Sequence, residues 1–454
     1  MSTKRIVSAA LALLLVAAIP ARATSVPTLT VIDTINPGSG SSYAMDASNS
    51  VALGDYLYFG ANDSTHGREL WRTNGTTTTL VMDINTGNSG ADSSSPRDFT
   101  ALGDFLYFRA TDDTHGRELW RTNGTTTELV NDINTGSSGT DSSDPDYFTT
   151  LGGYLYFQAN DSTHGAELWR TNGTTTELVM DINNGTDSSD PRHFTALSGY
   201  LYFSAIDATH GYELWRTNGT TTELVMDINT GSSGAESSNP YYFTALGGYL
   251  YFQAIDATHG YELWRTNGTT TELVMDINTG SSDTESSYPA DFTALGGYLY
   301  FQAYDGTHGY ELWRTDGTTT ALVMDINTNG ADSSYPQSFT ALGDYLYFRA
   351  YNGTQWYVHR TDGTTTERVP FPIDADQYVS CDCSDTNIVA VGGRLYTTVY
   401  SSDIGLEFAY LDEPTYVLPE TSRDGSLWTA TLVILAGLTA AASIVLRLRG
   451  ARRA

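Results

Sequence analysis

Short apolar stretches alternate with polar turns along most of the chain, and none of them carries a helical period. Residues 243–289 show this pattern clearly. Residues 243–246 are apolar, 249–254 are rich in aromatic side chains, 261–266 form a third such stretch, and 271–277 alternate apolar with polar positions. Aromatic and β-branched residues favour strands. The pattern therefore predicts four short antiparallel strands in this unit.

Turn signals separate the four predicted strands. Gly247-Gly248 follows the first strand, and Asp256-Ala257-Thr258-His259-Gly260 forms a loop after the second. Asn267-Gly268 stands between the third and the fourth. A type I′ turn needs positive φ at both central positions, which Asn-Gly tolerates, so we expect this turn here. Turn type also fixes the register of the strands that it joins.

The unit is repeated along the chain. The octapeptide Glu213-Leu214-Trp215-Arg216-Thr217-Asn218-Gly219-Thr220 has near copies that begin at Glu69, Glu118, Glu167, Glu262 and Glu311. The first glutamates are 49, 49, 46, 49 and 49 residues apart (118−69, 167−118, 213−167, 262−213, 311−262). A fixed period of this size indicates a repeat architecture.

The aromatic strand of each unit needs cover on both faces. Tyr249 and Tyr251 point one way, whereas Leu250 and Phe252 point the other. Four-stranded sheets stacked around an axis supply this cover, so we predict an all-β fold, a β-propeller of four-stranded blades. A β-solenoid or stacked-sheet array is the alternative. We expect Trp215 to be buried between blades, and the tryptophan of each octapeptide is a candidate structural residue of the repeat (Trp71, Trp120, Trp169, Trp215, Trp264 and Trp313).

The number of blades depends on how the last, degenerate units are counted. Six clear units are followed by a degenerate seventh over 345–364 and a weaker eighth over 391–409. We therefore predict eight blades, with seven as the alternative. Residues 28–38 resemble a fourth strand without its first three, so we expect residues 30–35 to pair with 406–411 and close the ring.

The octapeptide resembles the ELWxxDGT repeat of bacterial secreted proteins, most closely at Arg314-Thr315-Asp316-Gly317-Thr318. The Asp-Ile-Asn-Thr-Gly copies, and Asp33-Thr34-Ile35-Asn36-Pro37-Gly38, match the strand-to-linker stretch of the same repeat. The Gly-Gly turn before a Tyr-rich strand is similar to kelch-type blades. The resemblance covers most of the chain and implies a secreted, propeller-like module; it implies no particular activity.

Both ends of the chain carry transport signals. Residues 1–23 have the charged start, apolar run and small-residue cleavage pattern of a signal peptide. The predicted propeller spans 24–413, and 414–426 form a stalk. Residues 427–446 carry no charge and are long enough for one transmembrane helix, and the arginines of the 447–454 tail place that end in the cytoplasm.

The predicted location is thus the cell surface, with the propeller outside and a membrane anchor at its C-terminal end. Leu418-Pro419-Glu420-Thr421 resembles a sortase signal, with Ser422 in place of Gly, and the tail is also similar in layout to an exosortase-type tail. Sorting to the cell wall, or release, is therefore the alternative to a plain anchor.

The composition excludes one class of partner. The formal net charge is −30, which disfavours nucleic acid because phosphate binding needs a basic face. Many acidic residues stand in the equivalent linkers, and a propeller would gather them on one face (Asp141, Asp144, Asp187, Asp190, Glu236, Asp283 and Glu285). Cys381 and Cys383 are the only two cysteines and are candidates for a local disulfide. Nine sequons are candidate glycosylation sites (Asn62, Asn74, Asn123, Asn160, Asn172, Asn184, Asn218, Asn267 and Asn352).

Two repeated motifs could carry chemistry. Asp-x-Thr-His-Gly supplies an Asp and a His that could bind a metal or act as acid and base (the histidines are His66, His115, His164, His210, His259 and His308). Its recurrence in six units favours a structural role. Asp-x-Asn-x-Gly places oxygen donors at alternate positions, as at the start of a calcium loop (Asp83, Asn85, Asp181, Asp227, Asp276 and Asp325). Asx turns at strand ends explain the same residues.

No catalytic residue can be assigned from the sequence, which contains no nucleophile elbow, phosphate loop or His-Glu-x-x-His motif. A unique site is best sought where the repeats differ (His193, Trp356, His359, Arg368, Cys381, Cys383 and Arg394). The leading hypothesis is a binding or adhesion module for an extracellular protein or glycan. The alternatives are a hydrolase or lyase in the axial cleft and a structural surface-layer component. Exposed aromatics on one rim would favour glycan binding; two carboxylates and a His at the axis would favour an enzyme.

Overall fold

The computed structural model describes residues 35, 50–74, 76–87, 92–136, 140–230, 236–279, 285–369, 388–391, 394–401, 405–412, 431–436 and 442–447. The chain forms consecutive four-stranded antiparallel sheets, each in the order first to fourth strand. The first three blades are β1 (Ser50–Leu53), β2 (Tyr56–Asn62), β3 (Arg68–Thr73) and β4 (Thr78–Met82); β5 (Arg97–Leu102), β6 (Phe105–Asp112), β7 (Gly116–Thr122) and β8 (Thr127–Asn131); and β9 (Asp146–Leu151), β10 (Tyr154–Asn160), β11 (Ala166–Thr171) and β12 (Thr176–Met180).

Four more blades follow in the same order. They are β13 (Arg192–Leu197), β14 (Tyr200–Asp207), β15 (Gly211–Thr217) and β16 (Thr222–Met226); β17 (Tyr241–Leu246), β18 (Tyr249–Asp256), β19 (Gly260–Thr266) and β20 (Thr271–Met275); β21 (Ala290–Leu295), β22 (Tyr298–Tyr304), β23 (Tyr310–Thr315) and β24 (Thr320–Met324); and β25 (Gln337–Leu342), β26 (Tyr345–Tyr351), β27 (Trp356–Thr361) and β28 (Thr366–Arg368). The prediction of a propeller with four-stranded blades is confirmed.

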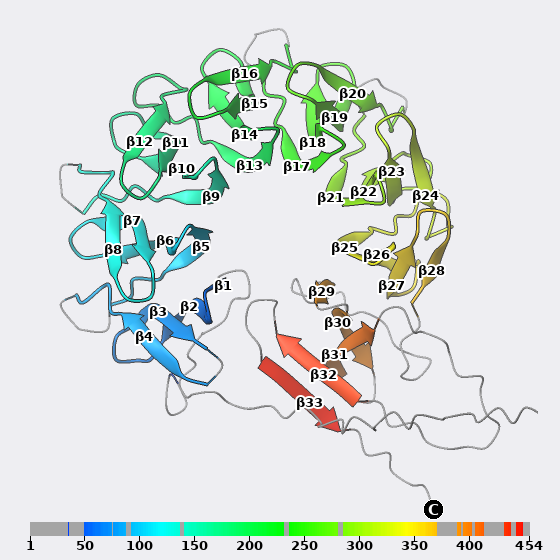
Figure 1. The fold of residues 1–454 in the computed structure, drawn as a ribbon. Helices are drawn as coiled ribbons and strands as arrows, with labels where there is room; N and C mark the ends of the chain where they lie inside the picture. Colours follow the sequence, from blue (N-terminus) through cyan, green and yellow to red (C-terminus); the bar gives the residue numbers. More distant parts are fainter. Residues whose placement is uncertain are drawn as a thin grey trace, which may run out of the picture.

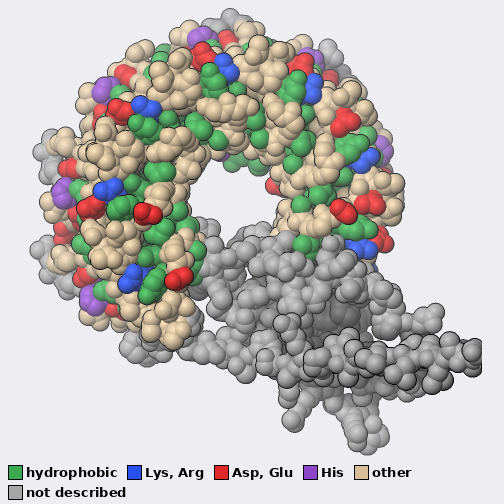
Figure 2. Space-filling view, viewed as in Figure 1, with side chains coloured by type: hydrophobic (Ala, Val, Ile, Leu, Met, Phe, Trp, Pro, Cys, Tyr) green, Lys and Arg blue, Asp and Glu red, His purple; other side chains and the backbone are tan. Residues whose placement is uncertain are grey.

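The blades stand side by side around an open centre, with the first strand of each innermost and the fourth outermost (Figure 1). The innermost strands of successive blades contact one another from β1 to β25. The space-filling view shows the central opening with hydrophobic side chains along its inner margin (Figure 2). The channel wall is therefore built from seven equivalent strands.

The hydrophobic core lies between blades rather than within them. The cluster between the third and fourth blades joins Tyr156, Leu168 and Ile182 of one to Leu201, Phe203, Ala205 and Trp215 of the next. Trp215 is 6 % exposed, which confirms its predicted burial between blades. Equivalent clusters connect the other neighbouring blades. Each blade therefore relies on its neighbours for cover.

The two hairpin turns of each blade lie on one face of the ring, which we call the turn face. Between β9 and β10, Leu151 pairs with Tyr154, so Gly152-Gly153 form a two-residue turn. Both of these glycines have positive φ, at 59° and 82°. This geometry is that of the tight hairpin turn expected from the sequence.

The type I′ turn predicted at Asn267-Gly268 is wrong. Thr266 pairs with Thr271, so four residues form the loop, and of these only Gly268 has positive φ. The Asn267 side chain explains the difference, because its Oδ1 accepts hydrogen bonds from the backbone N–H groups of Thr269 and Thr270 at 2.9 Å. The Asn therefore acts as a side-chain cap in a longer loop.

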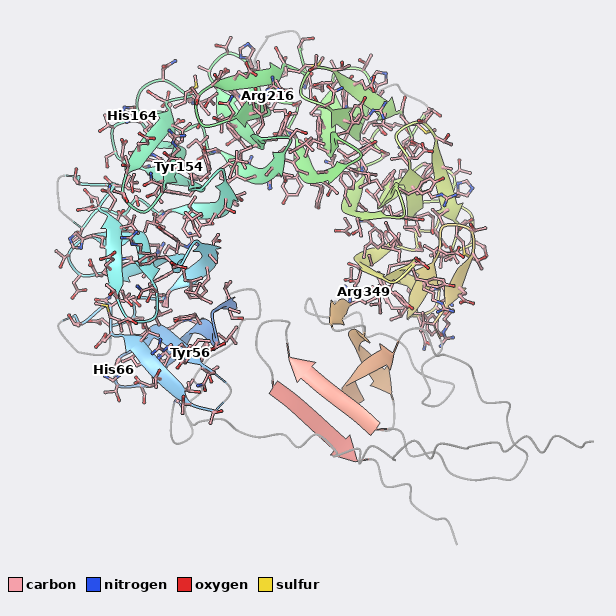
Figure 3. All side chains as sticks on the ribbon, viewed as in Figure 1. Tyr56, His66, Tyr154, His164, Arg216 and Arg349 are labelled. Atoms are coloured by element: carbon pink, nitrogen blue, oxygen red, sulfur yellow. The ribbon has the colours of Figure 1, made fainter. Side chains whose placement is uncertain are left out.

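The same loop fastens each blade to the one before it. Arg170 in the third blade donates from Nη1 to the carbonyl of Gly219 in the fourth, at 2.6 Å. Its guanidinium also lies over the Tyr154 ring, 4.4 Å from the centroid, and Arg216 repeats this arrangement one blade on, over Tyr200 (Figure 3). The Arg, Asn and Gly of the octapeptide thus form a contact between blades.

The structure gives a three-stranded sheet where an eighth blade was predicted. β29 (Val389–Val391), β30 (Arg394–Ser401) and β31 (Gly405–Asp412) pair in that order, and β29 contacts β25 of the seventh blade. Within the described ranges seven blades have four strands each, and this three-stranded sheet follows them in the chain. The proposed closing strand over 30–34 and the fourth strand expected near residue 416 lie outside the described residues.

The prediction of one helix over 427–446 differs from the structure. β32 (Thr431–Ala436) and β33 (Ala442–Arg447) lie in this range and pair antiparallel. Both contain β-branched residues, which favour strands, and Gly437 follows β32 directly. Among the described residues there is no helix long and apolar enough to cross a membrane.

Candidate functional site

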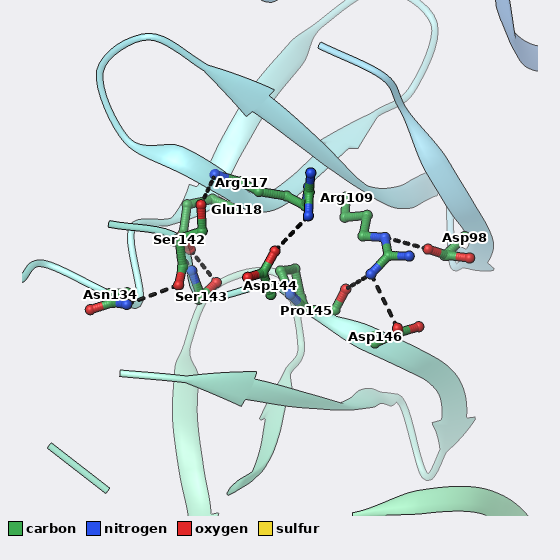
Figure 4. Close-up of polar contacts among 10 residues, drawn as sticks. All are labelled: Asp98, Arg109, Arg117, Glu118, Asn134, Ser142, Ser143, Asp144, Pro145 and Asp146. Carbon is green, nitrogen blue, oxygen red and sulfur yellow. Dashed lines mark hydrogen bonds and ion pairs between the residues drawn. The ribbon is translucent and has the colours of Figure 1, made fainter. Parts of the chain in front are cut away.

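The linkers between blades and the loops between second and third strands lie on the face opposite the turn face, because the strands of each blade are antiparallel. We call this the linker face. The buried glutamate of each octapeptide fixes its linker there. In the second blade Glu118 Oε1 accepts from the Ser143 N–H at 2.7 Å, while Oε2 accepts from the Ile133 N–H at 3.1 Å and the Ser143 hydroxyl at 2.5 Å (Figure 4). This carboxylate therefore holds both ends of the linker.

The Asp-x-Asn-x-Gly motif makes a second tie across the linker. Asn134 donates from its amide to the Ser142 carbonyl at 2.9 Å, and Asn85 makes the same bond to Ser93. Asp181 accepts from the Gly185 N–H at 3.1 Å. No group of three or more His, Cys, Asp or Glu side chains spaced to hold a metal ion occurs within the described ranges. Of the residues proposed for calcium, Asn85 and Asp181 therefore make hydrogen bonds within their linkers.

Each linker carries two non-glycine residues with positive φ. One is the residue before the linker proline (Ser95, Asp144, Asp190, Asn239, Tyr288 and Tyr335), with φ between 45° and 48°. The other is the second residue after the proline, inside a bulge of the innermost strand (Asp98, Tyr147, His193, Tyr242, Asp291 and Ser338), with φ between 57° and 61°. Such backbone costs about 1–3 kcal/mol per residue and clusters at functional sites.

The repeats differ from one another mainly at these positions. The segment from Ser142 to Phe148 is Ser-Ser-Asp-Pro-Asp-Tyr-Phe, and its counterpart from Ser286 to Phe292 is Ser-Ser-Tyr-Pro-Ala-Asp-Phe. The flanking Ser-Ser, Pro and Phe are kept, whereas the three residues around the proline change. The strained backbone thus presents a variable side-chain set on an otherwise repeated scaffold.

Aromatic side chains gather on part of this rim. His193 lies 4.0 Å from Tyr241, centroid to centroid, and Tyr241 lies 4.3 Å from Tyr242. Tyr288 and Tyr335 are 46 % and 49 % exposed, and contiguous exposed aromatic surface of this kind marks binding sites. We call Tyr241, Tyr242, Tyr288, Tyr310 and Tyr335 the tyrosine cluster.

The tyrosine cluster lines an open pocket of about 540 Å³ across the fifth and sixth blades. Gln253, Gln302 and Ala290 complete its wall. Tyr261 stacks on Tyr288 at 5.5 Å, and Tyr310 stacks on Tyr335 at 5.6 Å, so the exposed rings are held in place from behind. The pocket therefore combines rigid aromatic faces with two amide side chains and no charged side chain.

The opposite part of the rim is charged. Arg109 bridges two blades, with Nε 2.5 Å from Asp98 and Nη1 3.1 Å from Asp146 (Figure 4). Arg117 pairs with Asp144 at 2.8 Å. These three pairs engage the carboxylates of Asp98, Asp144 and Asp146.

The Asp-x-Thr-His-Gly loops show the same hydrogen bonds in every copy. Asp161 Oδ1 accepts from the Thr163 and His164 N–H groups at 2.9 Å and 2.7 Å, and Oδ2 lies 2.6 Å from His164 Nδ1. His66 and His164 lie at the outer margin of the ring (Figure 3). This Asx turn, capped by its own histidine, gives the motif a structural task.

Burial raises the pKa of Glu118, Glu167, Glu213, Glu262 and Glu311 to about 7, although the hydrogen bonds from the linker oppose the change. Between the ordinary pKa of 4.5 and about 7 the folded chain then binds more protons than the unfolded chain. The hydrogen bond that His210 donates to the Asp207 carboxylate raises the pKa of His210, which acts in the same direction.

We therefore expect the melting temperature to rise as the pH is lowered from about 8 to about 5. Thermal unfolding of the full chain, followed by circular dichroism across this range, measures the effect. The Glu213→Gln variant should show a shallower dependence, since one titrating group is lost. If the melting temperature instead decreases as the pH is lowered from 8 to 5, the raised pKa values of the buried glutamates are wrong.

The unique residues proposed from the sequence fall into different places. His359 stands opposite Phe348, where the other blades have tryptophan, and stacks on it at 5.6 Å. Burial lowers the pKa of His359 to about 4. Arg368 lies over the Tyr357 ring, and Trp356 packs near Tyr351. Cys381 and Cys383 lie outside the described residues, and Arg394 is placed only as part of β30.

Of these candidates only His193 lies on the rim with the tyrosine cluster. Burial, together with the charge of Arg192, lowers its pKa to about 4. The cluster itself was missed by the sequence reasoning. Its signal was the change of residue around the linker proline, which is visible once the repeats are aligned. The sequon asparagines lie at turns and loops, where most accept local backbone hydrogen bonds, as Asn172 does from Thr174 and Thr175.

No family model and no curated protein matches the chain. Several solved structures resemble it. They include prolyl endopeptidases (12% identity, 80% of this chain and 55% of that chain, TM-score 0.42), the β-propeller domain of the Trilobed protease from Pyrococcus furiosus (8%, 74% and 100%, TM-score 0.37), and the GH74 xyloglucanase from Xanthomonas campestris (13%, 72% and 54%, TM-score 0.35). The chain spans about half the length of the first and the last of these. At these identities the likeness concerns the β-propeller fold alone.

Proposed function

We propose that the protein is an exported β-propeller that binds a neutral polysaccharide on its linker face. The observation that carries the proposal is the tyrosine cluster, with its pocket of about 540 Å³. Sugar rings present flat C–H faces that pack on aromatic rings, and their hydroxyl groups bond to amides such as Gln253 and Gln302. Tyrosine supplies a large, rigid surface with a polar tip, which suits this kind of ligand.

The volume and the electrostatics support the same ligand class. A pocket of this size falls within the range that holds small ligands, here one or two sugar residues. No charged side chain lines the pocket itself, and the Asp291 carboxylate beside it accepts a hydrogen bond from Gln302 at 3.4 Å. The pocket is also open to the linker face, as a polymer that continues beyond it requires.

The other hypotheses gain less support. An enzyme in the axial cleft would need two carboxylates and a histidine together, but the ring neighbours of His193 are aromatic (Tyr147, Phe243 and Tyr241). Asp98 and Asp146 are both engaged by Arg109. A protein partner or a surface-layer role would use the same face without needing the amide-lined pocket.

Calorimetric titration of the full chain with neutral hexasaccharides (cello-, xylo- and manno-oligosaccharides) tests the proposal. We expect the double variant Tyr288→Ala/Tyr335→Ala to lose at least about tenfold in affinity, because it removes two stacking faces. Met275→Ala is the matched control, since Met275 is 37 % exposed on an outermost strand and does not line the pocket. Undiminished binding by the double variant would overturn the proposal.

Location is part of the proposal. Removal of residues 1–23 and display outside the cell would bring the linker face to extracellular glycans. The mass of the protein recovered from outside the cell tests this, because a mature chain beginning near Thr24 is expected. Recovery of the intact chain from the cytoplasm alone would contradict it.

A further inference from the structure

Two exposed tyrosine rings repeat from one blade to the next. Tyr288 and Tyr335 each precede a linker proline, with φ of 46° and 48°, and are 46 % and 49 % exposed. Tyr288 stacks on Tyr261 with centroids 5.5 Å apart and planes at 26°. Tyr335 stacks on Tyr310 at 5.6 Å and 24°. The two rings therefore share backbone, support and exposure, and we call them the two platforms.

The tyrosines behind the platforms are themselves held in place. The Tyr261 hydroxyl accepts from the Asn239 amide at 3.2 Å. The Tyr310 ring lies 5.3 Å from the Tyr304 ring. A ligand thus meets two preformed aromatic faces, and little conformational freedom is lost when it binds.

Both platforms line the same pocket, so one ligand can touch both. Gln253 and Gln302, which complete its wall, take equivalent positions in the second strands of the fifth and sixth blades. Each of these glutamines stands opposite the residue that directly follows a linker proline. The stacking faces and the amide groups therefore repeat together, with a step of one blade.

The blade step sets the period that a matching ligand needs. The fifth, sixth and seventh blades pack face to face through shared hydrophobic clusters. Sheets packed in this way lie about 10 Å apart, so equivalent groups of the ligand should recur at about that distance. A disaccharide of an extended polysaccharide has about this length, whereas a single sugar residue is too short.

The equivalence of the platforms also limits the linkage of the polysaccharide. Both platforms meet the ligand in the same way, so the sugars on them should present the same face. In an extended chain with equatorial glycosidic bonds, successive sugars turn over and every second sugar presents the same face. A chain with an axial glycosidic bond coils and does not repeat in this way over one disaccharide.

We propose that the tyrosine cluster binds an extended polysaccharide joined by equatorial glycosidic bonds, with every second sugar stacked on a platform. Tyr288 and Tyr335 supply the two stacking faces, and Gln253 and Gln302 bond to sugar hydroxyls at the same period. The inference rests on the proposed polysaccharide-binding function and names the class of polysaccharide that the site takes.

The test compares glucose oligomers that differ in linkage or in length. The full chain is titrated calorimetrically with cellotetraose, with maltotetraose, which differs only in the configuration of its glycosidic bonds, and with cellobiose. We expect cellotetraose to bind at least about tenfold more tightly than either, because only cellotetraose reaches both platforms in the matching geometry.

Single variants test whether the platforms are equivalent. Tyr288→Ala and Tyr335→Ala should each reduce the affinity for cellotetraose to about that for cellobiose, and by similar factors. Both side chains are exposed, so the core stays intact, and circular dichroism checks the fold. Tyr147→Ala is the matched control, since Tyr147 is 43 % exposed but does not line the pocket, and it should keep the preference.

The outcomes separate the inference from the proposed function. Equal binding of the two tetrasaccharides, equal binding of cellotetraose and cellobiose, or a loss in only one of the two alanine variants overturns the inference and leaves the proposed function standing. If no neutral glycan binds, the proposed function fails and the inference fails with it. Binding of oligoproline, blocked by Tyr288→Ala while no sugar binds, would show a peptide ligand and overturn both.

Discussion

Gly219→Ala is expected to lower the free energy of unfolding by about 3–5 kcal/mol, through strain, overpacking and a lost charged hydrogen bond together. Gly219 has φ of +85°, and a Cβ there would stand 2.4 Å from the Tyr156 hydroxyl and 2.5 Å from Arg170 Nη1. Both atoms belong to the preceding blade. The new methyl group must therefore push back the loop, the tyrosine or the arginine that donates to the Gly219 carbonyl.

Gly248→Ala separates the two causes. Gly248 has nearly the same φ, +82°, but no atom lies within 4 Å of its Cβ position. This variant should lower the free energy of unfolding by about 1–2 kcal/mol, through backbone strain alone. Urea unfolding of both variants, compared by transition midpoint, makes the measurement. If the two variants unfold at the same midpoint, the contact between blades contributes nothing beyond the turn itself.

Glu213→Ala is the second change with a large expected effect. Glu213 accepts from the Ile228 and Ser238 N–H groups, at 3.0 Å and 2.7 Å, and from the Ser238 hydroxyl at 2.5 Å. Removing the carboxylate leaves buried donors without an acceptor and opens a cavity, so we expect a loss of about 3–5 kcal/mol. The linker that carries Asn239 and Tyr241 should also lose its fixed position.

Glu223→Ala is the control for Glu213. Glu223 binds Arg216 at 2.6 Å but is 43 % exposed, so its loss should cost under about 1 kcal/mol. Urea unfolding again ranks the two, and hydrogen exchange of the Ser238 amide reports on the linker directly. Equal stabilities, or an Ser238 amide that stays protected in Glu213→Ala, would show that the carboxylate does not hold the linker.

The architecture could be predicted from the sequence because the determining features are local and repeated. The aromatic and alternating stretches form strands, as predicted, and Gly152-Gly153 form a tight turn between two of them. A strand that is apolar on both faces needs cover on both sides, and the packing between blades around Trp215 supplies it. The Asn-Gly loop was misjudged, since propensity alone does not show that the Asn side chain will cap the backbone. The helix expected over 427–446 was inferred from apolar length, a criterion that strands with β-branched residues also satisfy.

The candidate site was harder to predict because it depends on contacts between units. Tyr288 and Tyr310 are separated by a whole strand pair, and nothing in the local sequence shows that both line one pocket. Repetition drew attention to the motifs that are the same in every blade, whereas the candidate recognition residues are those that differ.

The strained residues beside each linker proline have a consequence for how such a protein can change. They stand at the surface on backbone that Glu213 and its counterparts fix from below, so the scaffold does not depend on their side chains. Exchanging Tyr288 for the aspartate found at position 144 should alter what is bound there while leaving the blade intact. Duplication of whole units, followed by substitution at these few positions, could therefore produce new ligand preferences without a new fold, and the order of the blades around the ring would determine the order of chemical groups that a polymer meets.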